Sequence, residues 1–600
     1  MGVVIGADME WSQRGIDVLG LSWNEGRSAT AVHRDERAMG QFLEVLRKAD
    51  VVVGQNFVDA DLMMLKREGL DVSGFENKVF DTRLAVHCTH GHLAGTGSYD
   101  LRSLVLLLGS RQGERFPLDF KQYESDLHRT CAMDSAAGLW LYPTLDRLVR
   151  AGKLEATLRV AHQCAPIFAQ MRDQGVRLDP AVLRQIHDER KTKTAELIER
   201  YHLWEERGKK VIKKVPIWRS DKVLDIFEGH FGLRPKDRQR KTWSKLVLDQ
   251  KLSAPAREFA GAMVDLGQGA NDAHWLGRAE EGEDGELSFG KVGDDGFIHP
   301  RYDICGSPDR AIASGPNIQN FPRPGEDPRP VPLRRAVVPL HDGHLILGAD
   351  FSSLETITNA YEHGDMDRVR AVLEGRLSHE GTATMLNNAF GLSLTRQQAK
   401  ACSHGFDKGE SPYNLARTLF KTERPSRQQV TQCQAIFNRM LAEFPKMSKF
   451  RDQLWERSVE NPLVVHNSFG RRLACFSRAK YGDSEGYSAK HDPTKKYWCS
   501  CPACAPRRDR FKYAIAFIGR SAGFDALLRA MAKIYYERRL DEFSLPYLEI
   551  HDELDYSVPA DRVEHYAGIL KMTFEEALPE LGGISLPASV VWGADWSEAH

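Results

Sequence analysis

The sequence has no excess of either charge, no long apolar run and few cysteines for its 600 residues. Its 82 basic and 83 acidic residues balance, so any charged partner has to be met by local patches. No apolar run approaches the length of a membrane span. The start, MGVVIGADMEW, lacks the features of a signal peptide or a myristoylation signal. We therefore expect a cytoplasmic protein with no membrane partner, whose ten mostly scattered cysteines are reduced.

The chain is too long for one hydrophobic core, so several domains are expected. Residues 1–150 alternate apolar strands with helical patterns, which indicates an α/β domain. Helical patterns dominate 151–290 and 366–447. The last 150 residues mix strands and helices around a polar segment at 479–510 that carries cysteines. The sequence shows no internal repeat and no long low-complexity tract.

Two apolar runs each end at a carboxylate. LILGADFSSLE carries Asp350, and LEIHDELDYSV carries Asp552 with Glu553 beside it. Short apolar runs bounded by polar residues predict buried strands. Two acids on strand ends suit a pair of divalent cations, and hard oxygen ligands favour Mg²⁺, with Mn²⁺ as a substitute. Such a metal pair supports phosphoryl transfer.

Four further acids lie in the first 150 residues. Asp8 and Glu10 follow an apolar strand at i and i+2, which places both side chains on one face. Asp61 and Asp134 lie in helical patterns further along. The four acids fit two metal ions that hydrolyse a phosphodiester. The alternative is a set of surface acids and helix caps.

Four residues spaced by four, Arg396, Lys400, His404 and Lys408, predict one stripe along a helix. A stripe of this kind can face a triphosphate and its base. The alternative is a solvated basic face. Gly405 argues against that alternative, because glycine weakens a helix and allows close approach.

Taken in order, four segments resemble the motifs of the family A, DNA polymerase I-like polymerases: GSPDRAIASGPNIQNFPR, LILGADFSSLE, TRQQAKACSHGFDKG and LEIHDELDYSVP. The resemblance covers nearly the whole chain. It implies α/β and α+β domains: a ribonuclease H-like 3′–5′ exonuclease domain followed by a right-hand polymerase. The implied boundaries are 1–150 for the exonuclease, 151–297 for the thumb with its basic tip at 234–241, 298–365 for the first part of the palm, 366–447 for the fingers, and 448–600 for the second part of the palm with the insertion at 479–510.

The resemblance also implies roles at the polymerase site. Asp350 and Asp552 would bind two metals, with the Phe351 carbonyl as a further ligand and Glu553 in support. Arg396 and Lys400 would hold the triphosphate. Glu355 would crowd the 2′-hydroxyl position, with His404 stacked on the sugar where the family often has Phe or Tyr. Lys408 replaces a tyrosine that packs near the templating base, which puts template geometry and fidelity in doubt.

DNA contacts are implied for Arg310, which matches a minor-groove arginine, and for the neighbouring pair Gln319 and Asn320. Arg520 replaces a family glutamine, and we expect it to reach phosphate instead. RPKDRQRK, at 234–241, resembles the thumb tip and fits neutralisation of the DNA backbone by Lys236, Arg238, Arg240 and Lys241. A solvated charge run is the alternative.

The N-terminal acids resemble the proofreading exonuclease pattern D-x-E, N-x-x-x-D, Y-x-x-x-D. Asp8 and Glu10 match the first element. The second matches loosely through Asn56, with Asp61 favoured over Asp59, and the third has Asp134 but Thr130 at the tyrosine position. We expect metal binding to survive and the exonuclease rate to fall. His128 can replace the tyrosine only if the helix starts after it.

Cys499, Cys501 and Cys504 form C-x-C-x-x-C in a polar, basic segment. Structural zinc usually takes four Cys or His ligands, and Cys475 or His491 is a candidate for the fourth. The alternative is three free thiols.

The leading hypothesis is a template-directed DNA polymerase with an attached 3′–5′ exonuclease. There are two alternatives: a nuclease whose polymerase half only binds DNA, and a non-catalytic replication scaffold. Expected partners are primer-template DNA and deoxynucleoside triphosphates, with a processivity factor or replisome proteins as further candidates, and the chain is expected to be a monomer. Histidine at position 404 favours a phage-type member of the family, and such a protein would act in the host cytoplasm.

Overall fold

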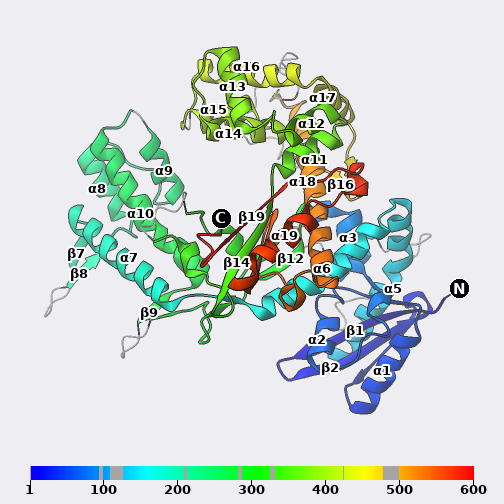
Figure 1. The fold of residues 1–600 in the computed structure, drawn as a ribbon. Helices are drawn as coiled ribbons and strands as arrows, with labels where there is room; N and C mark the ends of the chain where they lie inside the picture. Colours follow the sequence, from blue (N-terminus) through cyan, green and yellow to red (C-terminus); the bar gives the residue numbers. More distant parts are fainter. Residues whose placement is uncertain are drawn as a thin grey trace.

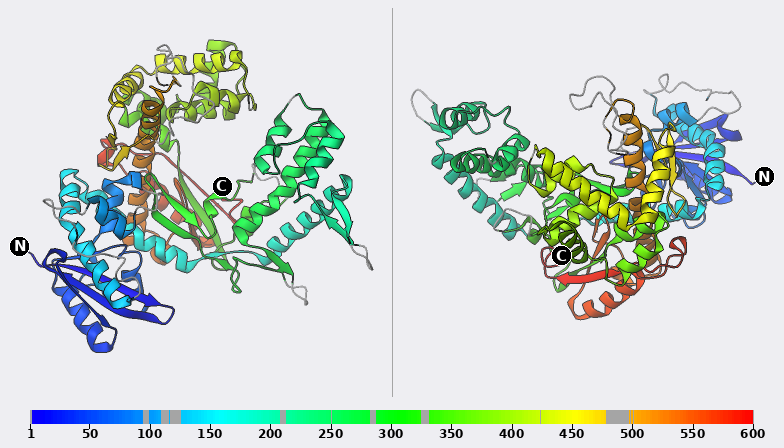
Figure 2. Two further views of the ribbon diagram at one scale, coloured as in Figure 1. Left: turned by 180° about the vertical axis from the view of Figure 1, so that it is seen from behind. Right: turned by 90° about the horizontal axis from the view of Figure 1, so that it is seen from above.

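The computed structural model has four parts, arranged around a central sheet (Figure 1). A helical arm (α7 to α10) and a helical cap (α12 to α17) diverge from this sheet, and the N-terminal unit lies beside it (Figure 2). No helix in the described part of the chain is long and apolar enough to cross a membrane. The structure describes residues 2–93, 99–108, 116, 126–207, 213–249, 251–281, 287–324, 331–422, 424–477, 497, 499 and 501–599.

The N-terminal unit is built on a five-stranded sheet of order β3-β2-β1-β4-β5. The first three strands are antiparallel, whereas β4 and β5 run parallel to β1. Helix α1 buries Met39, Leu43 and Leu46, since the spacing of three and four puts them on one face. The strands are β1 (Val4–Ser12), β2 (Gly15–Trp23), β3 (Ser28–His33), β4 (Val51–Gly54) and β5 (Val79–Asp81), and the helices are α1 (Glu36–Lys48), α2 (Asp61–Arg67), α3 (Thr82–Thr89), α4 (Leu101–Leu108) and α5 (Leu127–Ala151).

Helix α6 (Glu155–Gln174) connects the N-terminal unit to the centre. It packs against α3, against strand β12 (Arg301–Ser307) and against the long helix α18 (Ala505–Tyr536). Helix α6 thus packs between the N-terminal unit and the central part, and the helices that extend away as the arm follow it from α7 on.

The arm has a small core of its own, in which Phe227, Trp243 and Phe259 pack edge to face or tilted. Helix α7 starts at Pro180, where the Asp179 carboxylate accepts from two backbone N–H groups. The predicted basic turn links α8 to α9. The elements of the arm are α7 (Pro180–Arg200), β7 (Trp204–Arg207), β8 (Lys213–Pro216), α8 (Lys222–Phe231), α9 (Arg240–Leu248), α10 (Ala254–Leu276), β9 (Ala279–Glu281) and β10 (Leu287–Phe289).

The central sheet has the order β17-β18-β14-β19, with all neighbours antiparallel. The predicted strand through Asp552 is in fact two strands, because His551 has a φ of 68° and turns the chain between them. Asp552 therefore lies in a tight turn. The elements here are β14 (His344–Phe351), β17 (Leu548–Ile550), β18 (Glu553–Pro559), β19 (Ala588–Gly593), α11 (Leu354–Glu362) and α19 (Val563–Phe574), with the hairpin of β12 and β13 (Arg310–Ser314) and the pair β6 (Val176–Arg177) and β11 (Phe297–Ile298) nearby.

The cap is helical and has a separate core that includes Phe406, Phe437 and Met440. Its helix α14 begins with a capping box between Thr395 and Gln398, which satisfies the first free N–H groups. The elements are α12 (Met366–Leu373), α13 (His379–Phe390), α14 (Arg396–Asp407), α15 (Pro412–Leu419), α16 (Arg427–Glu443) and α17 (Pro445–Arg457), followed by the hairpin β15 (Leu463–His466) and β16 (Arg472–Cys475).

Candidate active sites

The two predicted strand-end carboxylates lie on neighbouring backbone segments of the central sheet. Asp350 pairs with Glu553 in the register of β14 with β18. The next residue, Phe351, donates its N–H to the carbonyl oxygen of Asp552 over 3.2 Å. Carboxylates two hundred residues apart in sequence are thus brought to one sheet end.

The pKa values at this sheet end show that the carboxylates of Asp350 and Asp552 repel one another. Burial first, and the Asp552 carboxylate second, raise the pKa of Asp350 to about 7. Burial also raises the pKa of Asp552, while Arg310 opposes this. Bound cations relieve the repulsion between such acids. Two carboxylates with a nearby backbone carbonyl at Phe351 are hard oxygen donors, so the residues present fit Mg²⁺.

A second pair of acids lies under these two. The side chains of Glu553 and Asp555 are 2% and 0% exposed. Gly348 stands opposite Asp555, and a Cβ there would lie 2.5 Å from the Asp555 Oδ1 atom. Burial raises the pKa of Asp555 to about 7. Sequence reasoning missed Asp555, although a charged residue within an apolar strand was a visible signal.

Glu355, in the first turn of α11, is contacted by three basic side chains, which together we call the Glu355 clasp. Arg310 and Lys408 each approach a carboxylate oxygen at 3.0 Å, and the Nδ1 atom of His404 lies 3.6 Å away. Burial alone would raise the pKa of Glu355, but His404, Lys408 and Arg310 lower it to about 2. The carboxylate is therefore ionised and fixed in place.

The predicted stripe on the cap helix is formed by three residues of α14, Arg396, Lys400 and His404. Lys408 follows the last residue of the helix and is its C-cap, so it does not continue the stripe. Arg396 pairs with Glu380 at 2.5 Å. The Lys400 ammonium is close enough to lower the pKa of Asp350, although burial and Asp552 raise it more.

Among the residues with implied DNA contacts, some are exposed and others already make contacts within the protein. Gln319 is 8% exposed, and its amide bonds to Ala311, Ala313 and Glu549 inside the protein. This residue supports the sheet in the structure, because its donors and acceptor are already used. Asn320 is exposed. Arg520 pairs with the buried Asp309 at 2.7 Å, so reaching phosphate requires this ion pair to open.

The basic turn of the arm is partly neutralised by its own neighbours. Arg234 pairs with Asp225 and Glu228, and Arg238 pairs with Asp221 at 2.6 Å. The remaining predicted cations of the turn are exposed: Lys236, Arg240 and Lys241.

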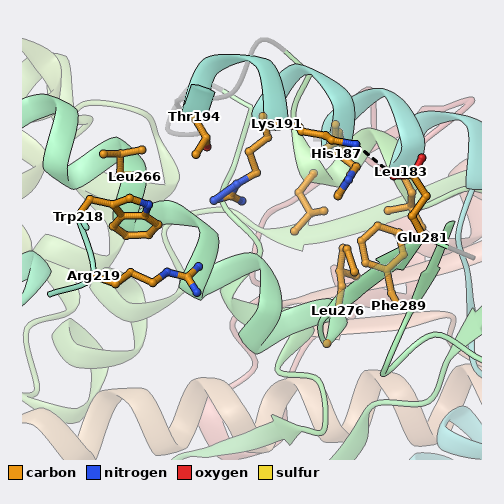
Figure 3. Close-up of a pocket in the computed structure, with 15 residues that line it drawn as sticks. Leu183, His187, Lys191, Thr194, Trp218, Arg219, Leu266, Leu276, Glu281 and Phe289 are labelled. Carbon is orange, nitrogen blue, oxygen red and sulfur yellow. Dashed lines mark hydrogen bonds and ion pairs between the residues drawn. The ribbon is translucent and has the colours of Figure 1, made fainter. Parts of the chain in front are cut away.

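The arm contains a hollow of about 470 Å³, whose lining residues are drawn in Figure 3. Apolar residues line both ends of it, with Leu266 beside Trp218 at one end and Leu276 beside Phe289 at the other. Lys191 and Arg219 are among the basic residues that line it, and Lys191 pairs with Glu281 at 3.1 Å. The lining suits an anionic partner more than a small apolar ligand.

The N-terminal unit holds a second acidic site. Oxygen atoms of Asp8, Glu10 and Asp134 all lie within 4.8 Å of one another. Asp61 is 4% exposed and, after burial, is the strongest cause of the raised pKa of Asp8. Burial and Glu10 raise the pKa of Asp134 to about 6. The site opens into a cleft of about 570 Å³ that is also lined by Arg83.

The start of helix α5, which carries Asp134, decides whether His128 can replace the missing tyrosine. Helix α5 starts at Leu127, so His128 is already inside it. The His128 ring is exposed and lies 6.3 Å from that of His33, on β3. Because the helix starts before it, the condition for His128 to replace the missing tyrosine is not met. Thr130 lies one turn before Asp134 on the same helix.

Comparison with known proteins places the chain in a family. The sequence model for DNA polymerase family A matches residues 289–598, just over half of the chain. The chain belongs to DNA polymerase family A. The matched region contains Asp350, Asp552 and the Glu355 clasp. It also contains all four segments that resemble family A motifs, so that resemblance is confirmed.

DNA polymerase I of Chloroflexus aurantiacus is 24% identical over 477 residues, which cover 77% of this chain and 46% of the relative. The thermostable DNA polymerase I of Thermus filiformis is 28% identical over 316 residues, covering 51% and 33%. The chain thus spans less than half the length of these relatives.

The fold has a match among solved structures. It is similar to the POL domain of Pol1 from M. smegmatis, solved in complex with DNA primer-template and dNTP, with a TM-score of 0.73 and 18% identity. The match covers 100% of this chain and 97% of that one. A mixed α/β polymerase fold is therefore confirmed.

Proposed function

We propose that the chain is a template-directed DNA polymerase that adds deoxynucleotides to a primer 3′ end. The observation that carries this proposal is the meeting of Asp350 and Asp552 at one sheet end, inside the region matched by the family. The helical arm, the central sheet and the helical cap correspond to thumb, palm and fingers.

Asp350, Asp552 and the Phe351 carbonyl are the residues that would hold two Mg²⁺ ions. Bound there, the ions would supply activation of the primer 3′-hydroxyl and stabilisation of the leaving pyrophosphate. The protein's own contribution is positioning. Lys400 and Arg396, which lie one turn apart on α14, bind the triphosphate oxygens from the cap side.

The Glu355 clasp selects the sugar. A carboxylate fixed by Arg310 and Lys408 crowds the position of a 2′-hydroxyl, so ribonucleotides fit poorly. His404 stacks on the sugar beside it. Lys408 replaces the family's tyrosine but keeps Glu355 in place by an ion pair, which explains how selection survives the loss of the ring.

We also propose that the N-terminal unit is a ribonuclease H-like 3′–5′ exonuclease of reduced rate. The support is the cluster of Asp8, Glu10 and Asp134 beside a cleft that Asp8 and Asp134 line, with the buried Asp61 next to Asp8, together with a mixed sheet of order β3-β2-β1-β4-β5. The rate is reduced because Thr130 is several ångströms shorter than the tyrosine that orients the attacking water in the family.

Primer extension with and without Mg²⁺ separates the candidate functions. A polymerase extends the primer only with the metal. A nuclease with an inactive polymerase half shortens the primer but never extends it, and a scaffold does neither, so either of these results with all four nucleotides present would contradict the proposal.

A further inference from the structure

Three cysteines gather at the start of the long helix α18. The sulfur atoms of Cys499, Cys501 and Cys504 all lie within 4.8 Å of one another, and all three residues are buried. Sulfur ligands bound to tetrahedral Zn²⁺ at about 2.3 Å lie about 3.8 Å apart. The cluster therefore already has nearly the compactness that a shared ion requires.

The other candidate ligands do not join this group in the described part of the chain. Cys475, at the end of β16, lies in a different apolar cluster with Leu463 and Phe511. His491 lies outside the described residues. The site is therefore argued from three thiols alone.

The backbone holds the cysteines in a knuckle. The N–H groups of Cys504 and Ala505 both donate to the Cys501 carbonyl oxygen at 3.0 Å. This tight turn keeps the Cys501 and Cys504 side chains together. Cys504 is the N-cap of α18 and gives the helix no side-chain cap bond.

Positively charged groups lie near the knuckle. A helix N-terminus carries a partial positive charge. The Arg507 guanidinium lies 4.5 Å above the Trp455 ring, and Arg508 donates to the Cys499 carbonyl oxygen at 3.5 Å. One Zn²⁺ with three thiolates has a net charge of about −1, which these groups compensate.

We propose that Cys499, Cys501 and Cys504 bind one structural Zn²⁺ at the start of α18. Thiolate sulfurs are the donors that select zinc over Mg²⁺. The three thiol protons are released to solvent on binding.

The cysteine knuckle packs against the neighbouring helix α17. Trp455, on α17, packs against the three cysteines, and Arg507 donates to its carbonyl oxygen at 2.8 Å. Further along α18, Arg520 and Asp525 make the ion pairs to Asp309 and Arg471. Zinc thus stabilises the helix that links the cap to the central sheet.

The test measures metal in the full-length chain, purified without a metal-affinity tag and without chelator. Elemental analysis is expected to give about one zinc per chain. A mercurial that blocks thiols should release it. The variant with Cys499→Ser, Cys501→Ser and Cys504→Ser is expected to lose the zinc, while Cys475→Ser keeps it.

Cobalt gives a second readout that needs no variant. After zinc removal, Co²⁺ added to the wild-type chain is expected to show sulfur-to-cobalt charge-transfer absorption, which a thiolate site produces and a carboxylate site does not. Zinc far below one per chain together with no cobalt–thiolate band would overturn the proposal. Zinc retained by the triple variant, or iron in its place, would overturn it as well.

Discussion

The backbone N–H of Phe351 donates to the carbonyl oxygen of Asp552 over 3.2 Å, and this bond joins the two backbone segments that carry the proposed metal ligands. Asp350 directly precedes Phe351, and its carboxylate lies close enough to Asp552 to be repelled by it. The repulsion between them appears as the raised pKa of Asp350. A site that tolerates this repulsion without cations is prepared for metal binding.

Lys408→Met is expected to weaken discrimination against ribonucleotides. The variant removes one of the ion pairs that fix Glu355, a contact worth about 1 kcal/mol after solvent screening, so discrimination should fall about fivefold. Single-nucleotide incorporation with dNTP and rNTP measures this. Lys408→Arg should retain most of the selection.

The matched control is Lys446→Met, because Lys446 is also half-exposed and also pairs with a carboxylate, that of Asp367. It should discriminate as the wild type does. If Lys408→Met rejects ribonucleotides as strongly as the wild type, the assigned role of Lys408 is wrong.

Thr130→Tyr is expected to raise exonuclease activity on a mismatched 3′ end by about tenfold, since a phenol one turn before Asp134 reaches the attacking water. Asp134→Ala should remove the activity. Thr144→Tyr, later on the same helix, is the control and should change nothing. A wild-type rate already equal to that of Thr130→Tyr would refute the explanation by shortness of the side chain.

Glu362→Gln is expected to reduce the loss of stability as the pH rises. Burial raises the pKa of Glu362 from 4.5 to about 7. Its stabilising effect is complete below pH 4.5, where folded and unfolded forms are both protonated, and it is lost as the pH rises to about 7. At pH 8 the variant should be more stable by about 1–2 kcal/mol.

Urea unfolding at several pH values measures this difference. The exposed Glu374→Gln is the control and should follow the wild type. Parallel pH profiles for the wild type and Glu362→Gln would show that the pKa of Glu362 is not raised in the folded state.

The sequence predicted those features of the site whose pattern lies within one short segment. The acids Asp350 and Asp8 were found because each ends an apolar run, which is a local pattern. The Glu355 clasp was not found, because Arg310, Glu355 and Lys408 come from β13, α11 and the end of α14 and meet only in the folded chain. Their separation in sequence gives no spacing to read.

Two other features were hidden for the same reason. The burial of Gln319 depends on Glu549, which is 230 residues away and accepts from its amide at 2.6 Å. The turn at His551, with its φ of 68°, interrupts a run that alternation alone predicts to be a single strand. The residue propensities favour one continuous strand, but the left-handed backbone at His551 turns the chain and places Asp552 in the turn.

The most direct test of the central claim is Mg²⁺-dependent primer extension by Asp350→Asn and Asp552→Asn. Both variants should still bind primer-template DNA and should melt no lower than the wild type, since each loses a repelling charge. Asp342→Asn, whose side chain is 94% exposed, is the control and should extend normally. The account predicts a fall in extension rate of at least about a thousandfold for both variants. Extension by either one within about tenfold of the wild-type rate would contradict it.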